Sequence, residues 1–253
     1  MFLKKVSTAK VSTTAAVFLF AICGQVLAQD SAPASLVSND CIIEPHKVVN
    51  IGSPVEAVLR VVKVDRGDVV KEWQVVAQLE SGVEKTSVNL AKERANFDQR
   101  NVERNKDLYE QQLISIHEKD ELETDSFLSR MELEHAEAIL SRRSIYTPIS
   151  GVVIERFLNE GEFVGSEPIL KIAQLNPLNV EVILPVDAFG QVKKGMTATV
   201  LPQQPVGGEY TAKVVIVDAV VDAASGTIGV RLELKNPSNR LPAGLKCRVE
   251  FNL

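Results

Sequence analysis

The sequence has few of the residues that carry most catalytic and metal-binding chemistry. Among its 253 residues, 3 are cysteine, 3 are histidine and 3 are methionine, and aromatic residues make up 5%. His117 and His135 fall in one predicted helix, about 27 Å apart along its axis, so these two cannot share a metal ion with each other. The third histidine is His46, and no nucleophile–base pair or phosphate-binding loop is visible. The sequence therefore predicts no enzyme, no metal site and no cofactor.

The chain also lacks an excess of positive charge. Its formal net charge is −5 at pH 7. Binding to nucleic acid draws most of its affinity from basic side chains that neutralise phosphates. We therefore expect no nucleic-acid partner.

Long hydrophobic runs are absent except near the N-terminus. Residues 15–23 are apolar and follow three lysines, and Val26-Leu27-Ala28 has the small residues of a cleavage site. This predicts a signal peptide over 1–28 and export to the periplasm, because the run is shorter than a typical transmembrane helix. Retention as an uncleaved anchor and lipidation of Cys23 are the alternatives, so the protein is peripheral to, or tethered at, the inner membrane.

The two other cysteines lie near opposite ends of the exported chain. Cys41 and Cys247 would meet an oxidising compartment, where disulfides persist. If both ends share one domain, a disulfide between them closes a very long loop. Two unpaired buried cysteines are the alternative.

Glycine and proline are both missing from residues 84–143, which are rich in good helix formers. A seven-residue spacing recurs in two sets, listed here: Val88, Ala95, Val102 and Tyr109; Leu122, Ser129 and Ala136. Ser115 has Glu118 three residues on, the spacing of a helix-capping box. We predict an antiparallel helical hairpin with helices at about 84–112 and 116–143.

What surrounds the hairpin is a repeat. One offset, 148 − 54 = 94, aligns Pro54 with Pro148, and the same offset aligns Gly67 with Gly161. An ungapped match of this kind indicates two halves of one unit, which we place at 48–83 and 144–176. The hairpin is then an insertion between the halves.

The remaining segments are β-like. Five short apolar segments are separated by Gly and Pro: 178–184, 196–201, 210–221, 228–234 and 246–251. They predict a small β-barrel or sandwich over 177–253. Residues 29–47 are expected to form a lead-in, flexible to about residue 39, and a first strand that can join the barrel.

In this order, the pieces resemble one family. They are similar to parts of the periplasmic adaptor subunits of bacterial efflux and secretion systems. The second half-motif of that family resembles Tyr146-Thr147-Pro148-Ile149-Ser150-Gly151-Val152-Val153. Its barrel domain resembles Ser225-Gly226-Thr227-Ile228-Gly229-Val230-Arg231. This is the membrane fusion protein, or HlyD-like, family. The resemblance implies a mostly β fold with an α-helical hairpin: a lipoyl-like β-sandwich from two half-motifs, the inserted coiled-coil hairpin and a C-terminal small β-barrel. Many members of the family continue into a membrane-proximal domain, but this sequence stops at Leu253, just past the last predicted barrel strand, so we expect no full membrane-proximal domain.

The resemblance further implies partners. The expected role is to link an inner-membrane transporter, of the RND type or alternatively the ABC type, to a TolC-like outer-membrane channel, for export of small molecules. The expected assembly is a homo-oligomer, a trimer or a hexamer. The family's channel-docking pattern matches Arg104, Leu108 and Ser115, which fall at the predicted turn of the hairpin.

Two residues depart from the family pattern. Ala57 and Trp73 stand where the first half-motif has glycines, which predicts less regular pairing in the first half. Trp73 is then either an interface aromatic or a cover for the sheet edge.

Two other functions compete with the adaptor. A lipoyl or biotinyl carrier needs a modified lysine on a tight turn between its halves, whereas this chain has about sixty residues there and Lys85 opens a helix. A coiled-coil scaffold with no transport role explains the hairpin but leaves the interrupted repeat unexplained.

Overall fold

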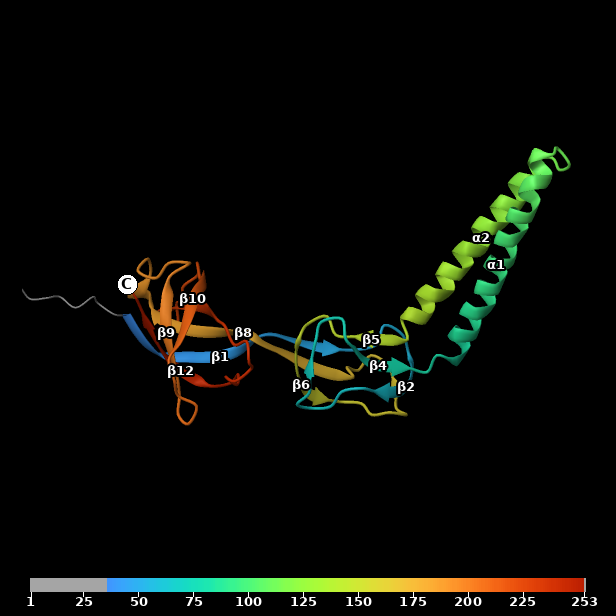
Figure 1. Ribbon diagram of the computed structural model, residues 1–253. Coiled ribbons are helices and arrows are strands. Elements are labelled where there is room, and N and C mark those ends of the chain that lie inside the picture. Colours follow the sequence, from blue (N-terminus) through green and yellow to red (C-terminus); the bar gives the residue numbers. More distant parts are fainter. Residues whose placement is uncertain (1–35, 253) are drawn as a thin grey trace, which may run out of the picture. The chain divides into compact units, whose positions relative to one another are not determined.

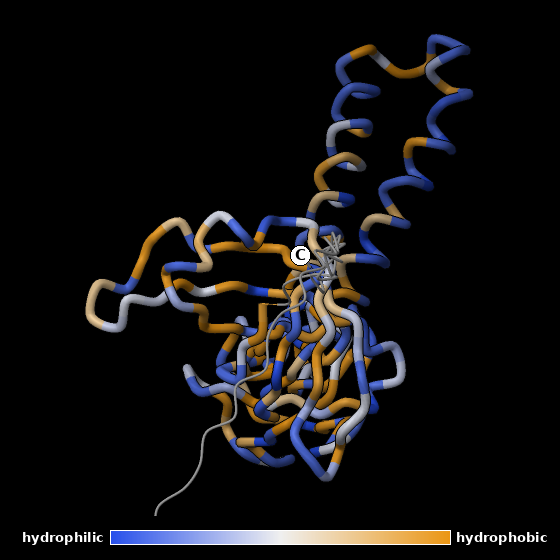
Figure 2. Tube along the Cα trace, turned by 90° about the vertical axis from the view of Figure 1, so that its left-hand side faces the viewer, coloured by the Kyte–Doolittle hydropathy of each residue, from blue (hydrophilic) through white to orange (hydrophobic). Residues whose placement is uncertain are grey.

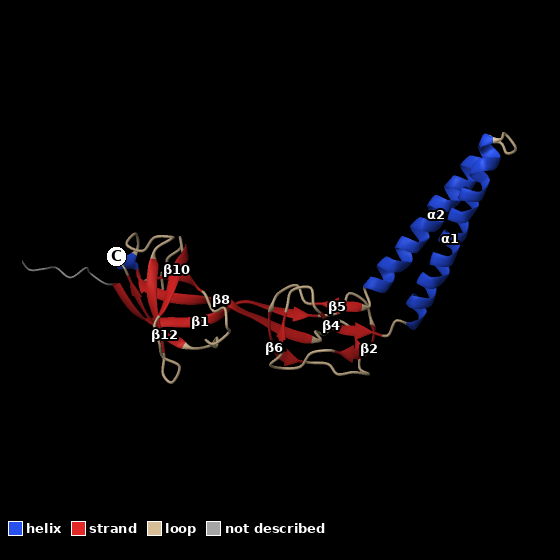
Figure 3. Cartoon of the chain, viewed as in Figure 1, coloured by secondary structure: helices blue, strands red, loops and turns tan. Residues whose placement is uncertain are grey.

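The computed structural model describes residues 36–252 (Figure 1). The predicted signal peptide, Cys23 and the lead-in up to residue 35 lie outside the described residues. The fold is mostly β with one α-helical hairpin, as predicted (Figure 3). The strands are β1 (Leu36–Ile51), β2 (Ala57–Val62), β3 (Val69–Val70), β4 (Val75–Leu79), β5 (Ser144–Tyr146), β6 (Gly151–Arg156), β7 (Phe163–Val164), β8 (Leu170–Pro185), β9 (Thr197–Pro202), β10 (Tyr210–Val217), β11 (Thr227–Leu234) and β12 (Lys246–Phe251). The helices are α1 (Gly82–Glu110), α2 (Ile116–Ser141) and the short 3-10 helix Val186–Ala188.

The C-terminal strands form a closed barrel. The hydrogen-bonded order is β1-β12-β9-β10-β11-β8, and a further pairing of β1 with β8 closes the ring. Closure leaves none of these strands with a free edge. The interior is apolar, and Leu178, Leu232 and Phe251 are fully buried in it.

The start of β1 corrects one expectation. We expected flexible chain up to about residue 39, but residues 36–38 pair with β12, with Leu36 opposite Phe251. Ser38 is buried, and its hydroxyl donates to the carbonyl of Ile183 at 2.9 Å. The small and polar residues on either side of Leu36-Val37 concealed the strand, which is held by backbone pairing with β12 and by packing of Leu36 on the barrel core.

The body between barrel and hairpin is a sandwich of two sheet regions. One region contains β5-β4-β2-β7, and the other contains β3, β6 and the first half of β8, with the end of β1. Residues from both halves of the repeat fill its core, among them Leu59 and its equivalent Val153, and Val70 and its equivalent Val164.

The pairing inside this body repeats with the offset of the sequence. Ala57 pairs with Val164 between β2 and β7, and Gly151 pairs with Val70 between β6 and β3. Each half therefore completes the other half's sheet. The expectation of less regular pairing in the first half is wrong, because the methyl group of Ala57 is accommodated where Gly151 has none. At Gly151 a Cβ atom would lie 2.2 Å from the carbonyl oxygen of Ala173, so only that copy requires glycine.

The hairpin helices pack through small side chains. Ala95 on α1 is buried, as are Ser126, Ser129 and Ala136 on α2. The seven-residue pattern marked this seam, and its small residues allow close approach of the two helices. Short polar and apolar stretches alternate along both helices (Figure 2). None of the helices among residues 36–252 has the length and apolar character needed to cross a membrane.

Candidate functional site

The tip of the hairpin is a tight turn stabilised by backbone hydrogen bonds. The Leu113 N–H donates to the carbonyl of Leu108 at 2.8 Å, and Gln112 takes a left-handed φ of 60°. A left-handed residue after the last turn is a common way to end a helix. It ends α1 at Glu110, two residues before the expected end.

Ser115 starts the second helix. Its hydroxyl accepts a hydrogen bond from the Glu118 N–H at 3.2 Å, which is half of the expected capping box. The capping contact uses the Ser115 oxygen as an acceptor, and its hydroxyl proton remains available to a partner because Ser115 is exposed.

Arg104 lies on the last turns of α1 and is exposed. Its Nη2 donates to the side-chain oxygen of Asn101 at 2.6 Å, and its Nε donates to the carbonyl of Arg100 at 3.3 Å. These contacts lie along its own helix, so its remaining guanidinium protons face solvent. Such a group can donate to carboxylates or carbonyl oxygens of another protein.

The turn also exposes three apolar side chains. Leu108 is 38% exposed, and Leu113 and Ile116 are 66% and 56% exposed. Sequence reasoning singled out Leu108 and missed the other two, although both flank the predicted break between helices. We call Arg104, Leu108, Leu113, Ser115 and Ile116 the tip surface, a mixed apolar and hydrogen-bonding surface of the kind found at the centre of protein interfaces.

Below the tip, contacts between the helices fix their relative position. The Lys119 ammonium of α2 lies 5.1 Å from the centroid of the Tyr109 ring of α1, and the hydroxyl of Ser126 on α2 lies 3.3 Å from the side-chain oxygen of Gln99 on α1. A cation over an aromatic face is attracted to it. The tip surface is thus presented by two helices that are joined close to their ends.

One side of the hairpin carries a row of exposed apolar residues. Val83, Leu90 and Phe97 recur every seven residues on α1, and Leu90 borders the same hollow as Ile139 of α2. Leu128 lies on the same side of α2, about three turns from Ile139. We call these five residues the apolar stripe. The opposite side of α1 is polar, with Lys85, Lys92, Gln99 and Lys106 at the same spacing.

Trp73 occupies the turn between β3 and β4. Its φ is 62°, so it keeps the left-handed backbone that a glycine would favour, and its N–H donates to the carbonyl of Thr147 at 2.8 Å. The side chain is 72% exposed. The alternative in which Trp73 covers the sheet edge is wrong, because most of the ring faces solvent.

The two cysteines are neighbours in the barrel. Cys41 on β1 lies opposite Cys247 on β12, with a Cα–Cα distance of 5.1 Å, and the structure joins them in a disulfide. Both lie next to the closing seam of the barrel, where Cys41 also pairs with Val182 of β8.

The histidines are separated in the structure. His46 Nδ1 lies 3.1 Å from the side-chain oxygen of Asn179, while His117 and His135 are exposed on α2. Among residues 36–252, no three His, Cys, Asp or Glu side chains are grouped so that they could hold a metal ion.

Known proteins resemble this chain both in its barrel and over most of its length. A family model described as the CusB-like β-barrel domain matches residues 178–253. The multidrug/solvent efflux pump periplasmic linker protein MepA of Pseudomonas putida is 23% identical over 219 residues, covering 79% of this chain and 56% of the relative. A UPF0194 membrane protein of Acidithiobacillus ferridurans is 29% identical over 162 residues, covering 56% of this chain and 48% of the relative. The chain thus spans about half the length of these two curated relatives.

Solved structures share the fold. A MacA–MexA chimeric protein with the α-hairpin domain of Pseudomonas aeruginosa MexA superposes with a TM-score of 0.72 at 22% identity, covering 86% of this chain and 81% of that one. MacA from Actinobacillus actinomycetemcomitans gives 0.63 at 21% identity, covering 86% and 78%. The predicted fold class is therefore confirmed. Residues 178–253 thus match the barrel domain of CusB-like proteins, and the chain as a whole is similar in sequence to efflux pump periplasmic linkers and shares the fold of MacA and of the MacA–MexA chimera.

Proposed function

We propose that the protein is a non-enzymatic periplasmic adaptor that links an inner-membrane efflux transporter to a TolC-like outer-membrane channel for export of small molecules. The observation that carries the proposal is the hairpin inserted between the two halves of the body, with the exposed tip surface at its end. A catalytic protein has no need of such an arm, whereas a connector does. Relatives named as efflux pump periplasmic linkers support the same role.

Docking to the channel is assigned to Arg104, Leu108 and Ser115. Arg104 offers free guanidinium protons to carboxylates or carbonyl oxygens, and Leu108 fills an apolar notch. Ser115 caps its own helix and offers its hydroxyl proton to the partner. Leu113 and Ile116 extend the apolar part of this contact.

The docking assignment is tested by Arg104→Asp and Leu108→Ser in cells that depend on this protein for export. Each variant should abolish export and lose crosslinks to the outer-membrane channel, while secretion and folding stay normal. Lys92→Asp is the matched control, because Lys92 is an exposed cation on the shaft of the same helix. Full export with both tip variants would rule out the assignment, and crosslinks to no channel would favour a scaffold without a transport role.

The inner-membrane partner is proposed to be an RND-type transporter, with an ABC-type transporter as the alternative. The match of residues 178–253 to the CusB-like barrel supports an efflux partner that contacts the barrel. Crosslinking from the exposed barrel residue Val220, followed by mass spectrometry of the captured membrane protein, distinguishes the two classes.

We also infer that copies of the protein associate, as a trimer or hexamer, with the apolar stripe packed against a neighbouring hairpin. The stripe places Leu90 and Phe97, 74% and 52% exposed, in a row that single folded chains rarely leave in water. Leu90→Gln with Phe97→Gln should shift the mass measured by light scattering towards the monomer. The control, Lys92→Gln with Lys106→Gln on the opposite side, should leave it unchanged.

A further inference from the structure

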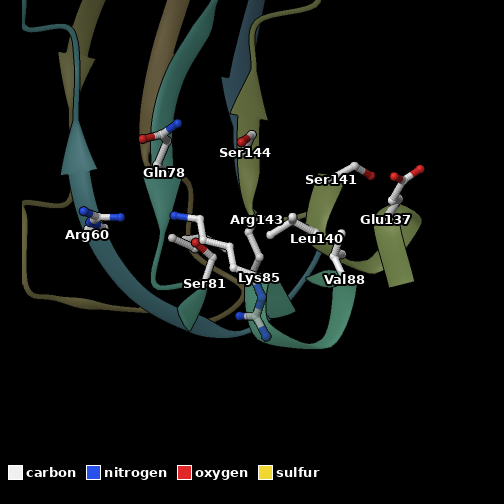
Figure 4. A pocket seen from close by; sticks show the side chains of 11 residues that line it. Arg60, Gln78, Ser81, Lys85, Val88, Glu137, Leu140, Ser141, Arg143 and Ser144 are labelled. Carbon is white, nitrogen blue, oxygen red and sulfur yellow. The ribbon is translucent and has the colours of Figure 1, made fainter. Parts of the chain in front are cut away.

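A hollow of about 350 Å³, with both apolar and charged side chains in its wall, lies at the base of the hairpin, where the helices meet the sandwich (Figure 4). Strands, both helices and the link after α2 contribute to its wall. The lining residues are Arg60, Gln78, Leu79, Ser81, Lys85, Val88, Glu137, Leu140, Ser141, Arg143 and Ser144. The docking role assigned to the far end of the hairpin makes no use of this site, which we call the base pocket.

Two cations of the base pocket face the same space without a counter-charge. Arg60 extends from β2 and Lys85 from α1, and Figure 4 shows their charged ends directed towards each other. Among residues 36–252, neither side chain forms a salt bridge. Like charges held close together repel each other, and an anion between them removes that cost.

The other charges of the wall do not neutralise this pair. Arg143 is already matched, because its Nη2 donates to the Glu84 carboxylate at 2.6 Å. Glu137 lies at the opposite end of the base pocket from Arg60, with its carboxylate pointing away (Figure 4).

The hydroxyl group of Ser81 completes the arrangement. Ser81 is 6% exposed and lines the base pocket at the position that precedes α1. Its hydroxyl does not cap the helix, and its oxygen is reached by the solvent that fills the base pocket. The backbone N–H of Ser81 is instead satisfied by the Glu80 carboxylate at 3.3 Å. A hydroxyl group that opens into the base pocket can donate its proton to a ligand there.

We propose that the base pocket binds a phosphate-type oxyanion between Arg60 and Lys85, with the Ser81 hydroxyl as a third donor. The three donors come from different directions: a strand, a helix face and the start of that helix. A tetrahedral anion offers several charged oxygens to such a set, whereas a carboxylate offers two. The hollow has room for more than an inorganic ion, so a small phosphate ester fits as well as free phosphate.

Calorimetric titration of the purified protein tests the proposal, with inorganic phosphate in one arm and glycerol 3-phosphate in the other at constant ionic strength. We expect saturable binding of one ligand per chain in at least one arm. The arm that binds more tightly identifies the source as the free ion or an ester. Arg60→Gln and Lys85→Gln should each weaken binding at least tenfold, and Ser81→Ala about threefold.

Lys92→Gln provides the matched control, since Lys92 lies two turns along the same side of α1 but outside the base pocket. The affinity of this variant for phosphate and for glycerol 3-phosphate should equal that of the wild type. Absence of saturable heat in both arms, or an equal loss in the control, would overturn the proposal. Because Ser81 makes no capping bond, Ser81→Ala should keep the wild-type melting temperature, which separates lost binding from lost folding.

Discussion

Arg143, just after the second helix of the hairpin, donates a 2.6 Å hydrogen bond to Glu84, near the start of the first, across 59 residues of chain. Both side chains are largely buried, at 21% and 15% exposure. The pair therefore joins the entry and the exit of the hairpin where solvent screens it poorly. Buried pairs of this kind are costly to break, because one charge is left without a partner.

Replacing Glu84 by alanine should thus lower the free energy of unfolding by about 1–3 kcal/mol. Urea denaturation measures the loss. Arg94→Ala is the comparison, because Arg94 is 67% exposed and lies 3.8 and 3.9 Å from its two carboxylate partners. That exposed pair should be worth less than about 0.5 kcal/mol. If both variants lost the same free energy of unfolding, burial would not be what makes the Arg143–Glu84 pair stronger than the exposed one.

Trp73 offers a substitution that should stabilise the monomer and weaken any contact made by the ring. A left-handed φ of 62° disfavours every residue with a side chain, so Trp73→Gly should raise stability by about 1 kcal/mol. Trp73→Ala keeps the backbone strain and removes the ring. If Trp73 is an interface aromatic, both variants should reduce association measured by light scattering, although only the glycine variant melts higher. Unchanged association in both would leave the ring without that role.

The disulfide between Cys41 and Cys247 closes almost the whole described chain, with a sequence separation of 206. Chain-entropy arguments then give a stabilisation of about 5 kcal/mol. Reduction with dithiothreitol, or Cys41→Ser, should lower the melting temperature markedly, and thiol titration of the unreduced protein should find neither cysteine free. Two reactive thiols in protein purified from the periplasm would exclude the bridge.

Glu162 provides a test by pH. Its carboxylate accepts hydrogen bonds from the backbone N–H and the side-chain amide of Asn159, and Arg156 adds a smaller attraction, so its pKa is lowered from the ordinary 4.5. A lowered folded-state pKa contributes stability above the unfolded-state value, and this contribution disappears as the pH falls through the folded-state pKa. Glu162→Gln should therefore be less stable than the wild type at pH 7, and the difference should shrink below about pH 4.5. A constant difference from pH 7 to pH 3 would contradict the assignment.

Local patterns carried most of what the sequence predicted. The spacing of Val88 and Ala95 marked the hairpin seam, and the offset that aligns Gly67 with Gly161 marked the halves of the body. Both glycines take a positive φ in equivalent turns, where Asp68 and Glu162 each accept from the backbone three residues earlier. Such features can be predicted because helix periodicity and turn-forming residues are properties of residues close together in the sequence.

Features made by distant residues could not be predicted in this way. The strand at residues 36–38 depends on pairing with β12, and three residues between small and polar neighbours are too few to show a strand pattern. The base pocket joins Arg60, Ser81 and Lys85 only after β2 has paired with β4, which brings the start of α1 beside Arg60. The exposure of Leu113 and Ile116 depends on the way the turn ends α1. From their hydrophobicity alone, both residues would have been assigned to a core.

The point where the hairpin leaves the body has an evolutionary consequence. Gln78 on β4 pairs with Ser144 on β5, so the chain departs and returns on neighbouring strands, about 5 Å apart. Whole heptads can be gained or lost in both arms without moving these two strands. The length of the hairpin can therefore change in evolution without altering the two strands that anchor it, so one body can carry hairpins of different length.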